Sequence, residues 1–133
     1  MQVVIAVTAA RHDALKAAGK DVPQSIIATL LLDTGAEISC IDKDIVQKLE
    51  LQPTGSANVN TPSTGSQSHQ CFCYDVDIVV PVPTSSALKH IPAVPVIEAD
   101  FSIQGHQGLI GRDILKEFRF TYSGPDDAVW ISF

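Results

Sequence analysis

The chain has 133 residues, 45% of them hydrophobic, and a formal net charge of −6. This length fits one domain over residues 1–133, and the acidic balance argues against a nucleic-acid partner, which requires a basic face. No basic run favours a membrane surface, and the apolar runs are far shorter than a membrane span. The cysteines are odd in number and no secretory leader is recognised, so we expect free thiols in a cytoplasmic protein. They are Cys40, Cys71 and Cys73.

Short β-rich or apolar runs, bounded by turn residues, predict a chain made mostly of strands. The longest run alternates apolar and polar residues, which is typical of a half-buried strand in an antiparallel sheet. Prolines within residues 91–97 predict an edge strand there. The predicted strands cover residues 3–7, 26–32, 38–41, 68–80, 91–97, 118–122 and 128–133.

Helical segments are predicted to be few and short. Residues 13–18 are rich in alanine and predict a turn or two of helix, or a loop. Asp42 is expected to cap a helix over residues 43–49, whose apolar side chains share one face. Another short helix is predicted over residues 113–118. The sequence therefore predicts an all-β fold, a small closed barrel or a sandwich, with one or two short helices.

An apolar run over residues 30–32 ends abruptly in Asp33-Thr34-Gly35. The run predicts a buried strand, and the glycine permits a tight turn that holds the aspartate at the strand end. A carboxylate in this place can face a cleft. Turns of this composition are also common without any function. The tripeptide alone is therefore also compatible with an ordinary turn after a strand.

A second motif, Leu109-Ile110-Gly111-Arg112-Asp113, follows further along the chain. The tripeptide is weak evidence for function by itself, but the two motifs at this spacing are strong evidence. Together the two motifs resemble the retropepsin family, the retroviral-type aspartic proteases. The resemblance covers nearly the whole chain. It is closest to bacterial members, through the stretches at residues 61–65 and 120–125.

The resemblance implies the closed acid-protease barrel and a catalytic role for Asp33, Thr34 and Gly35. Peptide hydrolysis by carboxylates requires two of them, and this chain carries one such motif. Asp113 is the rival for the second carboxylate, but its place at a helix start favours capping or structural support. We therefore expect Asp33 of a second copy to complete the site in a homodimer that acts on polypeptides.

The remaining site residues are also implied by the resemblance. Gly111, Arg112 and Asp113 are expected to support the active-site loop from behind. A loop over residues 61–66 takes the place of the flap that closes over substrate. The expected substrate-binding residues are Ala36, Glu37, Thr61, Pro62, Ser63, Thr64, Gly65 and Ser66.

The resemblance also implies an ion pair between Glu37 and Arg112 that locks the active-site loop to the helix behind it. A guanidinium can grip a carboxylate with two parallel hydrogen bonds. We expect this pair to be partly buried, so that removing one partner costs roughly 3–5 kcal/mol. Two surface charges, worth about 0–1 kcal/mol, are the alternative.

Two other interpretations compete with the protease. His69, Cys71 and Cys73 are zinc-ligand types on one face of a predicted strand, but a fourth ligand is missing and parallel side chains do not converge. We therefore expect no metal and no cofactor. The same fold can also serve as a dimerisation or peptide-binding module without hydrolysis, because fold does not fix function.

Overall fold

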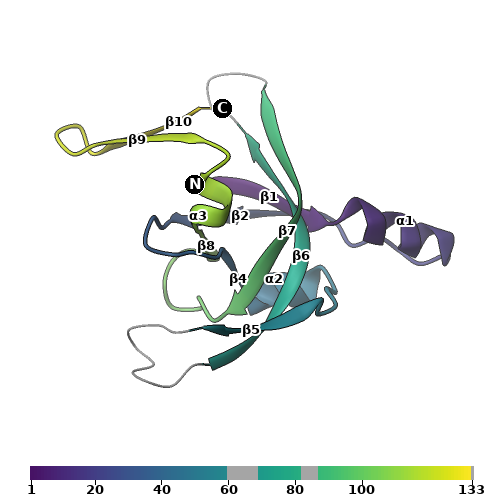
Figure 1. Cartoon of the computed structure of the whole chain (residues 1–133). Coiled ribbons are helices and arrows are strands. Elements are labelled where there is room, and N and C mark those ends of the chain that lie inside the picture. Colours follow the sequence, from purple (N-terminus) through teal and green to yellow (C-terminus); the bar gives the residue numbers. More distant parts are fainter. Residues whose placement is uncertain (60–68, 82–86, 133) are drawn as a thin grey trace.

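The computed structural model describes residues 1–59, 69–81 and 87–132 (Figure 1). Strands dominate, which confirms the predicted all-β class. The strands are β1 (Gln2–Val7), β2 (Ile26–Thr29), β3 (Leu31–Leu32), β4 (Cys40–Asp42), β5 (Gly55–Val59), β6 (His69–Pro81), β7 (Leu88–Ala99), β8 (Gly108–Ile110), β9 (Arg119–Ser123) and β10 (Ala128–Ser132). The helices are α1 (Ala9–Ala17), α2 (Lys43–Lys48) and α3 (Arg112–Leu115).

One curved sheet makes the body of the molecule. Its strands run in the order β2-β1-β6-β7-β4-β8-β3, and β5 pairs with β6. The strands at the two ends, β2 and β3, are neighbours in sequence on either side of Leu30. The sheet therefore curls until its ends approach, and the result is the nearly closed barrel that the sequence predicted.

Alternating apolar side chains fill the inside of this barrel. Val3 and Ile5 of β1, Val76 and Ile78 of β6 and Ile110 of β8 are fully buried. Burial of a large aliphatic side chain stabilises the fold by about 1.5–3 kcal/mol, so these alternating positions fix the register of the strands. Helix α2 contributes Ile45 and Val46 to the core, and Leu49 at its C-cap is buried there as well.

The alternation predicted for β6 is confirmed at its core-facing positions from Tyr74 to Val80, although Phe72 near the start of the strand is 54% exposed. On the opposite face, Asp77 is buried, where the pattern predicted a solvent-facing residue. A register shift lies between Val76 and Ile78. The Asp77 carboxylate accepts the Ala93 amide (2.9 Å) and contacts Nε2 of His90 (3.0 Å), so hydrogen bonds compensate its burial.

Two strand predictions were wrong in ways that matter for the barrel. Residues 26–32 form two strands, because the Leu30 amide donates to the Met1 carbonyl (2.8 Å) and the chain then changes partners. The predicted edge strand, β7, lies inside the sheet between β6 and β4. Its prolines are tolerated because β4 pairs only with the last part of β7, at Ile97–Ala99.

The first helix, α1, begins at Ala9, earlier than the alanine content predicted. The Thr8 hydroxyl caps it by accepting the Arg11 amide (3.3 Å). Helix α1 buries no residue and projects from the barrel (Figure 1). No helix in the described part of the chain is long and apolar enough to cross a membrane.

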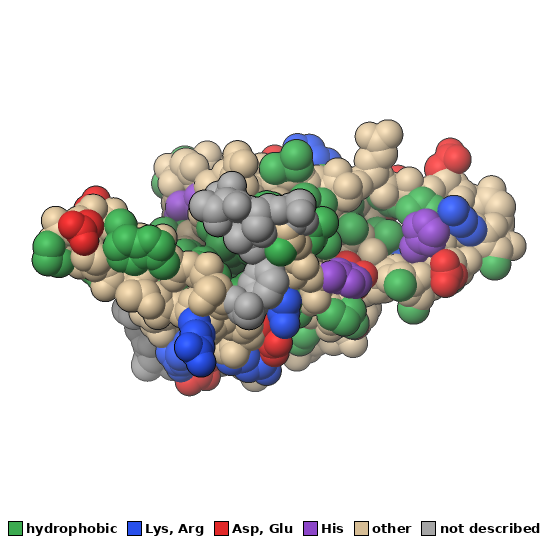
Figure 2. All heavy atoms as spheres, turned by 90° about the horizontal axis from the view of Figure 1, so that it is seen from above, with side chains coloured by type: hydrophobic (Ala, Val, Ile, Leu, Met, Phe, Trp, Pro, Cys, Tyr) green, Lys and Arg blue, Asp and Glu red, His purple; other side chains and the backbone are tan. Residues whose placement is uncertain are grey.

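Strands β9 and β10 form a separate two-stranded ribbon. The ribbon extends away from the barrel, and Figure 2 shows hydrophobic side chains along it. Phe120 near its base packs against the core, whereas Tyr122, Val129 and Trp130 are 60%, 45% and 53% exposed. The outer part of the ribbon therefore presents these three large side chains to solvent in the single chain.

Candidate active site

Asp33 stands at the end of β3, where the chain leaves the barrel. Strand β3 pairs in parallel with β8, so that Leu31 lies opposite Leu109 and Leu32 opposite Ile110. The Asp33 amide continues this ladder by donating to the Ile110 carbonyl (2.9 Å). The position of the aspartate backbone is therefore set by the sheet.

The loop after Asp33 wraps around its carboxylate. Oδ1 accepts hydrogen bonds from the amides of Gly35 (2.8 Å) and Ala36 (3.3 Å). A Cβ on Gly35 would lie 3.1 Å from this same Oδ1, so a larger residue would press on the carboxylate. Oδ2 accepts no hydrogen bond from the described residues, so one carboxylate oxygen is fixed and the other is available for chemistry.

The predicted neighbours of Asp33 are placed unevenly. Thr34 is exposed, and its hydroxyl makes no hydrogen bond to the described residues of the same chain. Ala36 is half-buried and Glu37 is exposed on the same loop. The predicted flap residues, Thr61, Pro62, Ser63, Thr64, Gly65 and Ser66, lie outside the described residues.

The second motif lies directly behind this loop. The Arg112 amide donates to the Ala36 carbonyl (2.9 Å), and the Asp113 amide donates to the Glu37 carbonyl (3.2 Å). A Cβ on Gly111 would lie 2.9 Å from the carbonyl carbon of Ile38, so only glycine permits this approach. The fold thus joins two motifs that are far apart in the sequence.

Arg112 holds the loop mainly through backbone carbonyls. Its Nη1 donates to the carbonyls of Thr34 (2.8 Å) and Gly35 (3.3 Å), and its Nη2 lies 3.3 Å from Oε1 of Glu37. The expected contact with Glu37 is therefore present. It is not buried, however, because the two side chains are 52% and 84% exposed, so the predicted cost of 3–5 kcal/mol does not apply in the single chain.

Ser39 is a site residue that sequence reasoning missed. Its hydroxyl donates to Oδ1 of Asp113 (2.7 Å) and accepts the Gly111 amide (2.9 Å), and its own amide donates to Oδ2 of Asp113 (2.9 Å). Asp113 supports the loop in this way instead of capping α3, whose N-cap is Gly111. A serine inside the apolar segment of residues 38–41 was the available signal.

A row of paired side chains leads across the sheet to the strand of Asp33. Successive partners are Leu31, Leu109, Cys40, Ile97 and Cys73. Directly paired residues project from the same face of a sheet. Ile97 is buried but does not belong to the core cluster inside the barrel. The row therefore lies on the outer face of the sheet, opposite the core.

The thiol of Cys40 lies close to the acidic groups of the site. Its pKa is raised from 9.0 to about 11, first by burial and then by the charges of Cys71, Asp113 and Asp33. No disulfide links Cys40, Cys71 and Cys73. No three His, Cys, Asp or Glu side chains in the described ranges are grouped to hold a metal ion.

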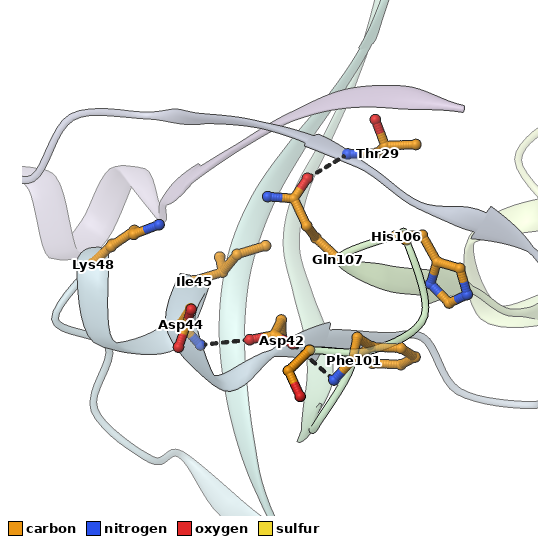
Figure 3. Close-up of a pocket in the computed structure, with 10 residues that line it drawn as sticks. Thr29, Asp42, Asp44, Ile45, Lys48, Phe101, His106 and Gln107 are labelled. Carbon is orange, nitrogen blue, oxygen red and sulfur yellow. Dashed lines mark hydrogen bonds between the residues drawn. The ribbon is translucent and has the colours of Figure 1, made fainter.

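A separate hollow of about 300 Å³ lies between α2 and the loop that follows β7 (Figure 3). The Asp42 carboxylate at its base accepts the amides of Asp44 (2.8 Å) and Phe101 (2.8 Å), which confirms Asp42 as the cap of α2. Asp33 does not line this hollow. Among the described residues, none of those that sequence reasoning selected for the site lines this hollow.

Known structures resemble this chain, although no protein-family model and no curated protein match it. A retropepsin-like aspartic protease from Rickettsia conorii aligns over 98% of this chain and 90% of its own, with 14% identity and a TM-score of 0.55. EIAV protease aligns over 68% and 76%, with 22% identity and a TM-score of 0.49. The retroviral protease-like domain of Ddi1 from Leishmania major aligns over 84% and 83%, with 17% identity and a TM-score of 0.49. The Rickettsia comparison spans almost the entire chain, and we conclude that this protein has the retropepsin-like fold that its two motifs predicted.

Proposed function

We propose that this chain is an aspartic endopeptidase, with the whole of residues 1–133 acting as one retropepsin-like domain. The observation that carries this proposal is the geometry of Asp33. Its Oδ1 is held by the amides of Gly35 and Ala36, while Oδ2 receives no hydrogen bond from the described residues. A carboxylate fixed at one oxygen and open at the other is prepared for acid–base work at a defined position.

The proposed reaction uses two Asp33 carboxylates, one from each subunit of a homodimer. One carboxylate takes a proton from the attacking water, and the other, protonated, polarises the scissile carbonyl. Like charges in close contact cannot both ionise, so the pair shares one proton. Thr34, exposed beside Asp33, is free to bond across the two-fold axis. The proposal requires no cofactor.

The ribbon of β9 and β10 is the proposed contact between the subunits. Its exposed apolar side chains include Tyr122 and Trp130, and its strands pair only with each other among the described residues. The N-terminus is occupied elsewhere, because β1 pairs with both β2 and β6 and the Met1 ammonium donates to the Leu30 carbonyl (2.7 Å). We therefore assign the dimer contact to the C-terminal ribbon.

The proposed substrate is an extended polypeptide. The row that ends at Leu31, together with the 42%-exposed Ile38, offers apolar surface beside Asp33 for substrate side chains. Ala36 and Glu37 and the loop over residues 61–66 are proposed to contact the substrate backbone. We also propose a cytoplasmic location, because no disulfide links the three cysteines.

Hydrolysis of an unfolded protein tests this proposal. Cleavage that a statine-containing peptide inhibits, by a species with twice the mass of one chain, is the expected result. A dimer that binds the statine peptide without cleaving any unfolded protein would instead identify a non-catalytic peptide-binding module.

A further inference from the structure

Ser39 is the most deeply buried polar side chain among the described residues. It is 1% exposed, compared with 7% for Asp42 and 8% for Asp77. Asp42 caps a helix and Asp77 bonds within two neighbouring strands, both away from Asp33. Ser39 instead lies at the end of the loop that begins with the proposed catalytic residue, so its burial requires a separate explanation.

The bonds of Ser39 connect that loop to two other parts of the fold. Its hydroxyl joins the Gly111 amide (2.9 Å) to Oδ1 of Asp113 (2.7 Å), and its amide reaches Oδ2 of Asp113 (2.9 Å). Its carbonyl accepts the Ile97 amide of β7 (3.1 Å). Every polar atom of Ser39 is therefore used to fix where the loop ends.

The beginning of the loop is fixed by β8, through the bond from the Asp33 amide to the Ile110 carbonyl (2.9 Å). Both anchors thus belong to the segment of residues 110–113. The Arg112 contacts between them are half-exposed and open to water, whereas the Ser39 hydroxyl is not. Removing this hydroxyl leaves the buried Gly111 amide without its acceptor, which is unfavourable unless the segment shifts to bring another acceptor within reach.

We infer that Ser39 is a positioning residue, whose hydroxyl sets the orientation of the Asp33 carboxylate through the loop of residues 33–39 without touching substrate. The inference rests on the proposed function and deepens it. A displaced catalytic group slows the chemical step, and a shift of about 1 Å can cost about 100-fold in rate. Substrate binding to the flanking apolar surface does not depend on this hydroxyl.

Two variants of equal volume isolate the hydroxyl. Ser39→Thr keeps it and Ser39→Val replaces it with a methyl group, so any misfit from the added bulk is common to both. We expect kcat of the Val variant to be about 10- to 100-fold below that of the Thr variant, with KM within about twofold. Ser102→Ala removes an exposed hydroxyl that donates to Asp100 (2.6 Å), and it should leave kcat unchanged.

Hydrogen–deuterium exchange gives a readout that does not need activity. The amides of Gly35 and Ala36, which bond to Asp33, should exchange faster in the Val variant than in the Thr variant. Equal kcat and equal exchange in the two variants would overturn the role of Ser39. If the wild-type chain hydrolyses nothing, the proposed function fails, and the exchange comparison still decides on Ser39. If the larger side chains of the Thr and Val variants prevent folding, the same measurements compare Ser39→Ala with the wild-type chain.

Discussion

At the scale of single residues, Asp33 carries the proposed chemistry. In Asp33→Asn the side-chain oxygen can still accept the amides of Gly35 and Ala36, so the loop should keep its shape. We expect hydrolysis to fall at least about 1,000-fold, because both subunits lose the carboxylate and none remains to take the proton from water. Thermal unfolding and turnover, measured together, check this. Asp13→Asn, at a side chain that is 81% exposed, is the matched control. Wild-type turnover in Asp33→Asn would exclude the assignment.

Cys40 gives a residue-scale test that does not depend on activity. Burial and the nearby charges raise the pKa of its thiol from 9.0 to about 11. Only the thiolate reacts with an alkylating reagent, so near pH 8 its reaction should be about 100-fold slower in the folded protein than in the unfolded chain. Mass spectrometry of alkylated peptides, with and without urea, measures this ratio. Equal rates in the two states would contradict the described surroundings of Cys40.

Arg112 supports the loop through its fork of donors. Lysine keeps the charge but cannot reach the carbonyls of Thr34 and Gly35 together with Glu37. Because the guanidinium is half-exposed, we expect Arg112→Lys to lower the free energy of unfolding by about 1–2 kcal/mol and to reduce activity. Arg119→Lys should change it by less than about 0.5 kcal/mol. Urea unfolding of both variants checks the difference, and equal losses would remove the proposed role of Arg112.

At the scale of elements, the ribbon of β9 and β10 is the part to test. Strand β10 pairs only with β9 among the described residues, so its loss should leave the barrel intact. We expect deletion of residues 130–133 to yield a monomer, or a chain that aggregates through exposed β9. Trp130→Ser, which keeps the ribbon and removes one 53%-exposed side chain, should weaken the dimer more mildly. Sedimentation measures both, and a dimeric, active deletion variant would refute the assigned contact.

At the scale of the whole molecule, each chain supplies only one of the two proposed carboxylates. Activity should therefore depend on formation of the dimer. Turnover per subunit should fall as the protein is diluted through the dimer dissociation constant. It should be highest at mildly acidic pH, because the pair of carboxylates must hold one shared proton. Progress curves over a dilution series at several pH values check both expectations. Constant turnover per subunit far below that dissociation constant would rule out a shared site.

The sequence by itself determined the features that depend on local chemistry. Alternation and short apolar runs predicted most strands, Asp42 was recognised as a helix cap, and Asp33-Thr34-Gly35 was recognised as a strand followed by a turn. These succeed because side-chain period and turn geometry act between near neighbours. The two motifs, by resemblance, also predicted the barrel that the structure shows.

Only the tertiary structure decided how distant segments meet. Thr34 and Arg112 are 78 positions apart, and they become neighbours because β3 pairs with β8. The fold also buries Ser39 and leaves Glu37 exposed, and the pairing of β7 with both β6 and β4 places this proline-containing strand inside the sheet. Burial and partners at these positions depend on long-range packing, which a local pattern does not encode. For that reason the sequence pointed to the loop that begins at Asp33, while the contacts of Ser39 at the end of this loop emerged only from the fold.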